Sequence, residues 1–157
     1  MKPHLVIGLG NPLMGDEGIG CVLAERLARD PRLPASIEVV EGGTDLLGCA
    51  GRMEGRTRVT LLDAVLDPAE AGKLRVYEDD FSALEASQPS AHQLSVAGSL
   101  ELLKVAYPSL REIRFKLLAV AVSSAEMRNE LSPGLEAKLP ELIGRVLQEL
   151  EGGVLRK

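Results

Sequence analysis

The chain has 157 residues, 45% of them hydrophobic and 26% charged, which is typical of a single globular domain (residues 1–157) with a substantial core. The formal net charge of −5 and the absence of a basic stripe argue against nucleic-acid binding. The apolar runs are too short for a membrane span or a signal peptide, and Cys21 and Cys49 lack metal-type spacing, so we expect a cytoplasmic protein with free thiols.

The first stretch, residues 5–20, reads Leu-Val-Ile-Gly-Leu-Gly-Asn-Pro-Leu-Met-Gly-Asp-Glu-Gly-Ile-Gly and predicts a strand, a glycine-rich loop and the start of a helix. A dinucleotide-binding loop fits poorly, because Leu13 occupies the third glycine position. Asp16 and Glu17 would also place negative charge where a pyrophosphate binds. The two acids either complement the helix dipole or hold a cation, and nucleotide binding remains the weaker alternative.

The helix after Glu17 has one apolar face at helical spacing, formed by Ile19, Val22, Leu23 and Leu27. Residues 37–40 predict the second strand. The Gly42-Gly43-Thr44 segment after it is typical either of a tight turn or of a place where a peptide backbone approaches closely, with Thr44 capping a short helix.

Residues 59–66 predict a third strand, and Asp63 interrupts its apolar run near the carboxyl end. A carboxylate buried there is costly unless it is paired, hydrogen-bonded or bound to a metal, and open α/β sheets bind ligands at this end of their strands. The alternative is that Asp63 caps a loop. We favour a functional site.

A short polar link leads to a strand at residues 73–78, too close for a helical crossover, so the two strands should pair antiparallel if they are neighbours. The sheet is therefore expected to be mixed. A loop follows over residues 79–91. The last core strand is predicted at residues 113–122, where the apolar run indicates an interior position.

The loop leads to His92, at the start of a helix whose predicted core positions are Leu94, Ala97, Leu102 and Val105. A histidine at a helix start is commonly a cap or a hydrogen-bonding residue, and the only other histidine, His4, is expected to have a structural or surface role.

A final helix opens at Ser132-Pro133, with a kink or a fresh start at Pro140 and an end at Gly152-Gly153. Its predicted core face consists of Leu142, Ile143, Val146, Leu147 and Leu150.

Glu17, Asp63 and His92 remain as side chains that the architecture does not explain. Two carboxylates and one imidazole suit a divalent cation such as nickel or zinc, and three protein ligands leave coordination positions open for water or substrate. Their convergence is a prediction.

The sequence resembles the maturation endopeptidases of nickel–iron hydrogenases over nearly its whole length. The motifs that carry the resemblance are Gly8-Leu-Gly-Asn11-Pro-Leu-Met-Gly-Asp16-Glu17-Gly-Ile-Gly20, Glu41-Gly-Gly-Thr44, Leu62-Asp63-Ala64 and His92-Gln-Leu94. Glu41 stands where aspartate is commoner in the family and keeps the charge.

The resemblance implies a three-layer α/β/α fold with a twisted sheet, and an enzyme that removes a C-terminal extension from the hydrogenase large subunit once nickel is inserted. Carried over by position, Glu17, Asp63 and His92 would contact the metal and act in catalysis, and Asp16 would support them. Gly42, Gly43 and Thr44 would recognise the substrate. The nickel would come with the precursor, no organic cofactor is expected, and the enzyme is expected to act as a monomer without nucleic acid or membrane.

Two other functions stay open, a nucleotide-binding α/β module and a non-catalytic chaperone of the precursor. The protein could sense nickel as a non-catalytic chaperone of the precursor, because no serine or cysteine nucleophile stands in a strained elbow. A metal-independent cut with Asp16 or Asp63 as general base is a further possibility.

Overall fold

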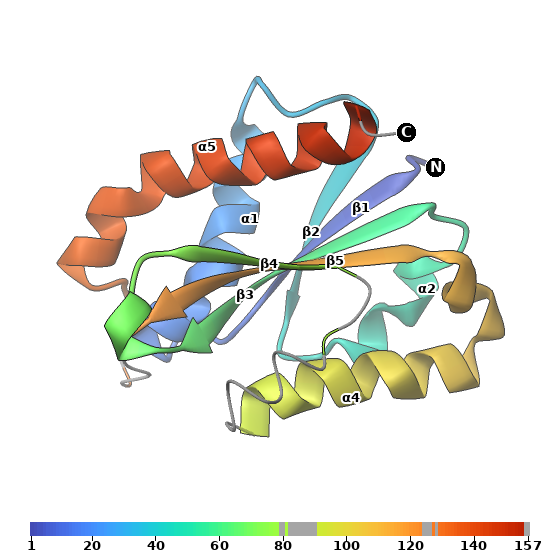
Figure 1. Cartoon of the computed structure of the whole chain (residues 1–157), viewed down its shortest axis with the longest axis horizontal. Helices are drawn as coiled ribbons and strands as arrows, with labels where there is room; N and C mark the ends of the chain where they lie inside the picture. The colour runs from blue at the N-terminus through green and yellow to red at the C-terminus, as the bar shows by residue number, and fades with distance from the viewer. Residues whose placement is uncertain (79–80, 82–90, 124–126, 128, 156–157) are drawn as a thin grey trace.

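The computed structural model describes residues 1–78, 81, 91–123, 127 and 129–155, with only the backbone for residues 91–95 and 152–155. Five strands form one twisted sheet in the order β2-β1-β3-β5-β4 (Figure 1). Strand β4 runs antiparallel to β5, and the other neighbouring pairs are parallel, which confirms the mixed sheet. The strands are β1 (His4–Leu9), β2 (Ile37–Gly43), β3 (Arg58–Leu66), β4 (Leu74–Glu78) and β5 (Arg114–Val122).

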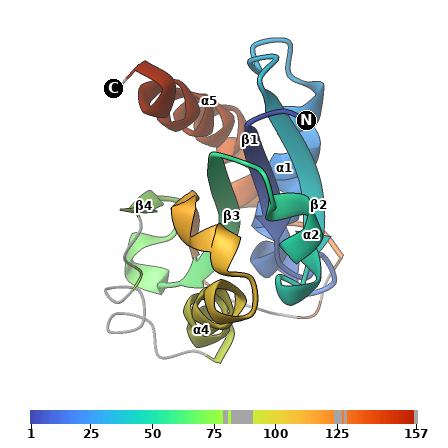
Figure 2. The same cartoon turned by 90° about the vertical axis from the view of Figure 1, so that its right-hand side faces the viewer.

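Helices cover both faces of the sheet, so the expected three-layer fold is confirmed (Figures 1 and 2). One face carries η1 (Gly15–Gly18), α1 (Ile19–Arg29) and α5 (Pro133–Leu155). The other carries η2 (Leu47–Cys49), α2 (Ala50–Met53) and α4 (Ala91–Ala106). Two short turns, η3 (Pro68–Glu70) and η4 (Pro108–Glu112), lie in the connections.

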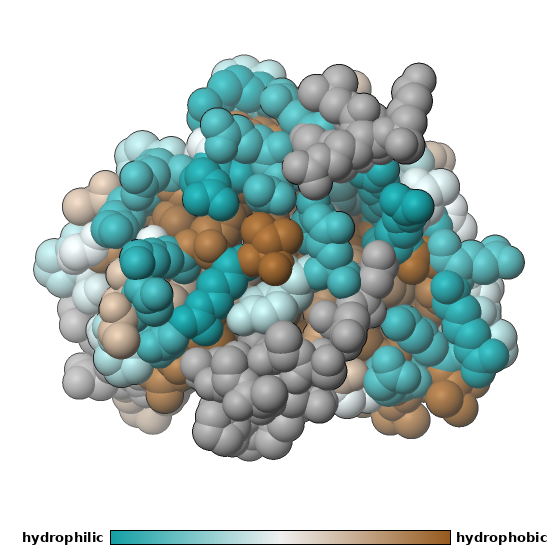
Figure 3. Space-filling view, viewed as in Figure 1, coloured by the Kyte–Doolittle hydropathy of each residue, from teal (hydrophilic) through white to brown (hydrophobic). Residues whose placement is uncertain are grey.

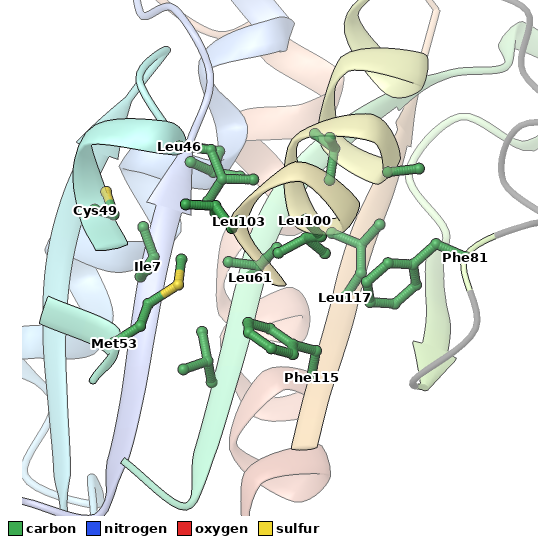
Figure 4. Packing of buried hydrophobic residues seen from close by; sticks show 14 of the residues in the cluster. Ile7, Leu46, Cys49, Met53, Leu61, Phe81, Leu100, Leu103, Phe115 and Leu117 are labelled. Carbon is green, nitrogen blue, oxygen red and sulfur yellow. The ribbon is translucent and has the colours of Figure 1, made fainter. Parts of the chain in front are cut away.

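Side chains of the interior strands alternate between two hydrophobic clusters, because successive residues of a strand point to opposite faces. Leu5 and Ile7 of β1 join the cluster under α2 and α4, whereas Val6 joins the cluster under α1 and α5. Figure 4 shows the first cluster, in which Leu100 of α4 packs above Leu61 of β3. Burial on both faces explains why these strands read as continuous apolar runs.

The connection after β3 leads to a strand that is not its neighbour, so the condition under which β3 and β4 were predicted to pair antiparallel is not met. It crosses the end of β5, where the backbone N–H groups of Asp67 and Gly72 donate to the carbonyls of Val122 and Ala121. Strand β4 then pairs antiparallel with β5 from the far side. The short link between β3 and β4 excluded a helical crossover, but it did not determine which strand β4 pairs with. The loop expected over residues 79–91 lies almost wholly outside the described residues.

The predicted core face of α4 is wrong at two positions. Leu102 and Val105 are 56% and 67% exposed. The side chains that face the sheet are Val96, Ala97, Leu100 and Leu103. The helix carries apolar residues around much of its circumference, so spacing alone did not select the buried side.

Helix α5 confirms its predicted core face but not its predicted boundaries. The five core positions are all buried, and the carbonyl of Ser132 accepts the N–H of Glu136 at the expected start. The helix continues through Pro140 without a fresh start and extends past Gly152 to Leu155. Apolar packing on both sides of Pro140 compensates for the single hydrogen bond that proline cannot make.

The outer face formed by α5 and β4 is mostly polar, with a strip of apolar atoms between the two elements (Figure 3). Val76 of β4 is an exposed apolar residue. Within the part of the chain that the structure describes, no helix has the length and apolarity needed to cross a membrane.

His4 has the structural role expected of it, at the end of the sheet away from the strand carboxyl ends. Its Nε2 lies 2.8 Å from the hydroxyl oxygen of Thr60 on β3. Burial, reinforced by the positive charges of Arg58 and Lys116, lowers the pKa of His4 from 6.5 to about 4. The imidazole is therefore neutral in the folded protein at neutral pH.

This shift predicts a loss of stability in acid. Between pH 6.5 and pH 4, His4 is protonated in the unfolded chain but neutral in the folded chain. The free energy of unfolding therefore decreases as the pH falls through this range. Between pH 7 and pH 5 the free energy of unfolding should fall by about 2 kcal/mol through this group alone. Urea unfolding of His4→Gln at both pH values should lack that component; an identical pH dependence in the variant would contradict the assignment.

Candidate functional site

The start of α1 packs directly on the backbone at the carboxyl ends of β1 and β3. A Cβ atom on Gly20 would lie 2.2 Å from the carbonyl oxygen of Leu9 and 2.3 Å from that of Leu62. A Cβ atom on Gly8 would lie 2.5 Å from the carbonyl oxygen of Gly20. The glycines of the first motif therefore permit a close contact between helix and sheet.

Gly10 links this contact to two other predicted site segments. Its φ of +124° suits glycine, and a Cβ atom there would lie 2.3 Å from the carbonyl oxygen of Glu17. Its N–H donates to the carbonyl of Gly43 at 2.9 Å. The glycine loop thus brings Glu17 and the end of β2 to the same edge of the sheet.

Asp63 lies in the carboxyl half of β3, opposite Ala119 of β5, and is only 2% exposed. Its Oδ1 accepts a hydrogen bond from the N–H of Ala64 at 2.8 Å. The η1 turn that carries Glu17 contacts β3, and Glu17 itself is half-buried. The structure therefore brings the segments of Glu17 and Asp63 together, with Asp63 the more deeply enclosed.

Cys21, interpreted from sequence only as a small core residue, also lies at this edge. Its thiol donates to the carbonyl oxygen of Gly10 at 3.4 Å and lies 3.7 Å from that of Gly8. Burial raises the pKa of the Cys21 thiol, and the carboxylates of Glu41 and Asp63 raise it further. The thiol therefore stays protonated, and its hydrogen bond to Gly10 stabilises the glycine loop. No sequence pattern predicts this role.

Asp16 forms a hydrogen-bonded pair with Ser132, the residue before α5. The N–H of Ser132 donates to Oδ1 at 2.7 Å and its hydroxyl donates to Oδ2 at 2.8 Å. Asp16 as a residue is 6% exposed. The contact joins residues 116 positions apart, so only the fold reveals it.

The Gly42-Gly43-Thr44 segment borders a pocket of about 110 Å³ between the end of β2 and α4. Thr44 does not cap a helix as predicted; Asp45 accepts the N–H of Gly48 at 2.9 Å instead. Apart from Gly43 and its chain neighbours, no atom of the described residues lies within 4 Å of a Cβ placed on Gly43. The pocket is lined by Leu9, Gly43, Thr44, Asp45, Leu46, Leu47, Val96 and Ser99.

His92 is the second residue of α4, as the sequence predicted, but its side chain lies outside the described part of the structure. Val96, one helical turn further along, lines the pocket beside Gly43. The backbone of His92 is therefore one turn from that pocket. Among the side chains that the structure describes, no three His, Cys, Asp or Glu residues form a metal-binding group, so the three-ligand site stays a prediction.

A model of the hydrogenase maturation protease family matches residues 21–149. The hydrogenase 2 maturation protease of Escherichia coli strain K12 is 32% identical over 155 residues, which cover 96% of this chain and 92% of that protein. The chain belongs to the hydrogenase maturation protease family. Family membership makes the protein a peptidase and confirms the resemblance seen in the motifs.

Solved structures of hydrogenase maturation proteases share the fold. The maturating endopeptidase HybD from E. coli superposes with a TM-score of 0.78 and 30% identity, covering 96% of this chain and 93% of that one. The hydrogenase 2 maturation peptidase from Thaumarchaeota archaeon SCGC_AB-539-E09 gives a TM-score of 0.70 and 26% identity, covering 96% and 99%. The α/β/α architecture of the chain is therefore that of the family.

Proposed function

We propose that this protease removes the C-terminal extension of a nickel–iron hydrogenase large-subunit precursor after nickel has been inserted. Membership of the family supports a role in hydrogenase maturation. The observation that carries the proposed site is Asp63, a carboxylate enclosed at the carboxyl end of β3 beside the turn that bears Glu17. Open α/β sheets bind their ligands at this edge.

In this proposal Glu17, Asp63 and His92 contact nickel that the precursor already holds, and they are the catalytic residues. Carboxylate and imidazole donors without a thiolate bind nickel loosely by themselves. The same donors can complete the coordination sphere of a metal already held by the precursor. Loaded precursor would then bind more tightly than empty precursor, and this difference in affinity would make nickel a checkpoint. The metal is part of the substrate, and no organic cofactor is required.

The peptide to be cut would approach along Gly42, Gly43 and Thr44. The space that the described residues leave beside Gly43 supports this, because a peptide backbone can approach a glycine closely. The pocket between this segment and α4 would receive a substrate side chain. The cut itself would follow either from polarisation of the scissile carbonyl by nickel or from a water activated beside Asp63.

The only proposed partner is the large-subunit precursor. The protease would act on it as a monomer in the cytoplasm, without binding nucleic acid or a membrane. The formal net charge of −5 supports the absence of nucleic acid.

Intact-mass measurement of a nickel-loaded precursor, before and after incubation with this protein, tests the proposal. The expected result is loss of the C-terminal peptide. A stable complex without any mass change would contradict cleavage and favour a chaperone that senses nickel. Size-exclusion chromatography of the same mixture separates that outcome from a simple failure to bind.

A further inference from the structure

Two features of η1 indicate that contacts with other elements hold the turn in its conformation. It is a single 3-10 turn of four residues, and no side chain caps its N-terminus. It nevertheless carries Glu17 at the edge where the proposed chemistry takes place. A short uncapped turn has little intrinsic stability, so the orientation of Glu17 depends on what the turn is fastened to.

η1 contacts β3 and continues into α1, and the pair formed by Asp16 and Ser132 fastens its first half to the start of α5. Both carboxylate oxygens of Asp16 accept hydrogen bonds from Ser132, at 2.7 and 2.8 Å. Hydrogen bonds to a charged group are strong, and two of them on one planar group fix its orientation as well as its position. Asp16 is buried and Ser132 is half-buried, so the two bonds are partly shielded from water.

Ser132 is itself held in place by the longest helix of the described chain. Its carbonyl accepts the N–H of Glu136 at 2.9 Å, so it is continuous with the 23-residue helix α5. The core face of α5 is buried against the sheet. Ser132 therefore connects the well-packed helix α5 to the first half of η1, while the other end of η1 continues directly into α1.

We propose that Ser132 is a positioning residue, which fixes the orientation of Glu17 through its two hydrogen bonds to Asp16. The proposal rests on the proposed function, because it is Glu17 that would meet the nickel. It also assigns Asp16 a positioning role in place of a role as general base, since Ser132 engages both of its oxygens.

The first test is amide hydrogen exchange, which needs no substrate. The N–H of Glu17 donates to the carbonyl of Met14 at 3.2 Å, so its exchange rate reports how often the turn opens. Ser132→Ala should raise that rate about tenfold, and Ser132→Thr, which keeps the hydroxyl, should restore protection. The control is Ser109→Ala, an exposed serine of η4. Equal protection in Ser132→Ala and the wild type would overturn the proposal.

The second test separates positioning from chemistry with nickel-loaded precursor. Ser132→Ala should lower kcat/KM about 10-fold or more, with Ser132→Thr recovering most of the loss. Asp16→Asn should cleave about tenfold faster than Asp16→Ala, because the amide can still accept the Ser132 N–H and donate to its hydroxyl. Equal and complete losses in both Asp16 variants would overturn the positioning role and indicate a base. Absence of cleavage by the wild type would refute the proposed function, while the exchange result would still decide the role of Ser132.

Discussion

Glu17→Gln and Asp63→Asn should each reduce processing of the nickel-loaded precursor by about 100-fold or more while leaving the fold intact. Each change removes a negative charge from the proposed metal contact but keeps the size of the side chain. The amide oxygen that replaces Oδ1 of Asp63 can still accept the N–H of Ala64, so the loss should reflect charge and not packing. The measurement is kcat/KM from the rate of appearance of the C-terminal peptide.

Glu25→Gln is the matched control for these two variants. Glu25 lies on α1 and is exposed, and its ion pair with Arg29 at 3.1 Å is a surface contact of small energetic value. The Glu25→Gln variant should process the precursor at the wild-type rate. Unchanged turnover in Asp63→Asn, with a normal melting temperature, would demote Asp63 to a structural residue.

Gly20→Ala should have the largest effect on stability. The added methyl group would lie 2.2 and 2.3 Å from two backbone carbonyl oxygens, and backbone at the ends of two strands cannot move aside as a side chain can. The start of α1 would have to lift from the sheet, at a cost of about 3 kcal/mol, and Glu17 would move with it. Urea unfolding measures the loss.

The control is the same substitution at Gly144, in the middle of α5, where a Cβ atom meets nothing within 4 Å. Gly144→Ala should raise the free energy of unfolding, by up to about 1 kcal/mol, because alanine is the better helix former. Similar stabilities for the two variants would show that the close packing of α1 on the sheet is not required.

The sequence predicted those parts of the fold that local pattern controls. Strands buried on both faces are continuous apolar runs, and the position of Asp63 at the end of such a run was therefore visible. The glycine spacing of the first motif was visible for a similar reason, because close packing of a helix on a strand requires it.

Other features depend on contacts between distant segments and leave no local pattern. The apolar residues of α4 offer more than one possible face, and only packing against β3 and β5 selects Leu100 and Leu103 over Leu102. The place of β4 beside β5 follows from where its link crosses the sheet. The bond between Asp16 and Ser132 joins two polar residues that each have an ordinary local explanation, as a helix-start acid and as a helix cap.

We expect the protease to cut only a precursor that holds nickel. The most direct measurement incubates the wild-type protein with two samples of the same precursor, one loaded with nickel and one free of it, and follows both by intact mass. The expected result is loss of the C-terminal peptide from the loaded sample alone. Cleavage of both samples at equal rates would support the endopeptidase function. It would contradict the proposed role of Glu17, Asp63 and His92 as contacts to the metal.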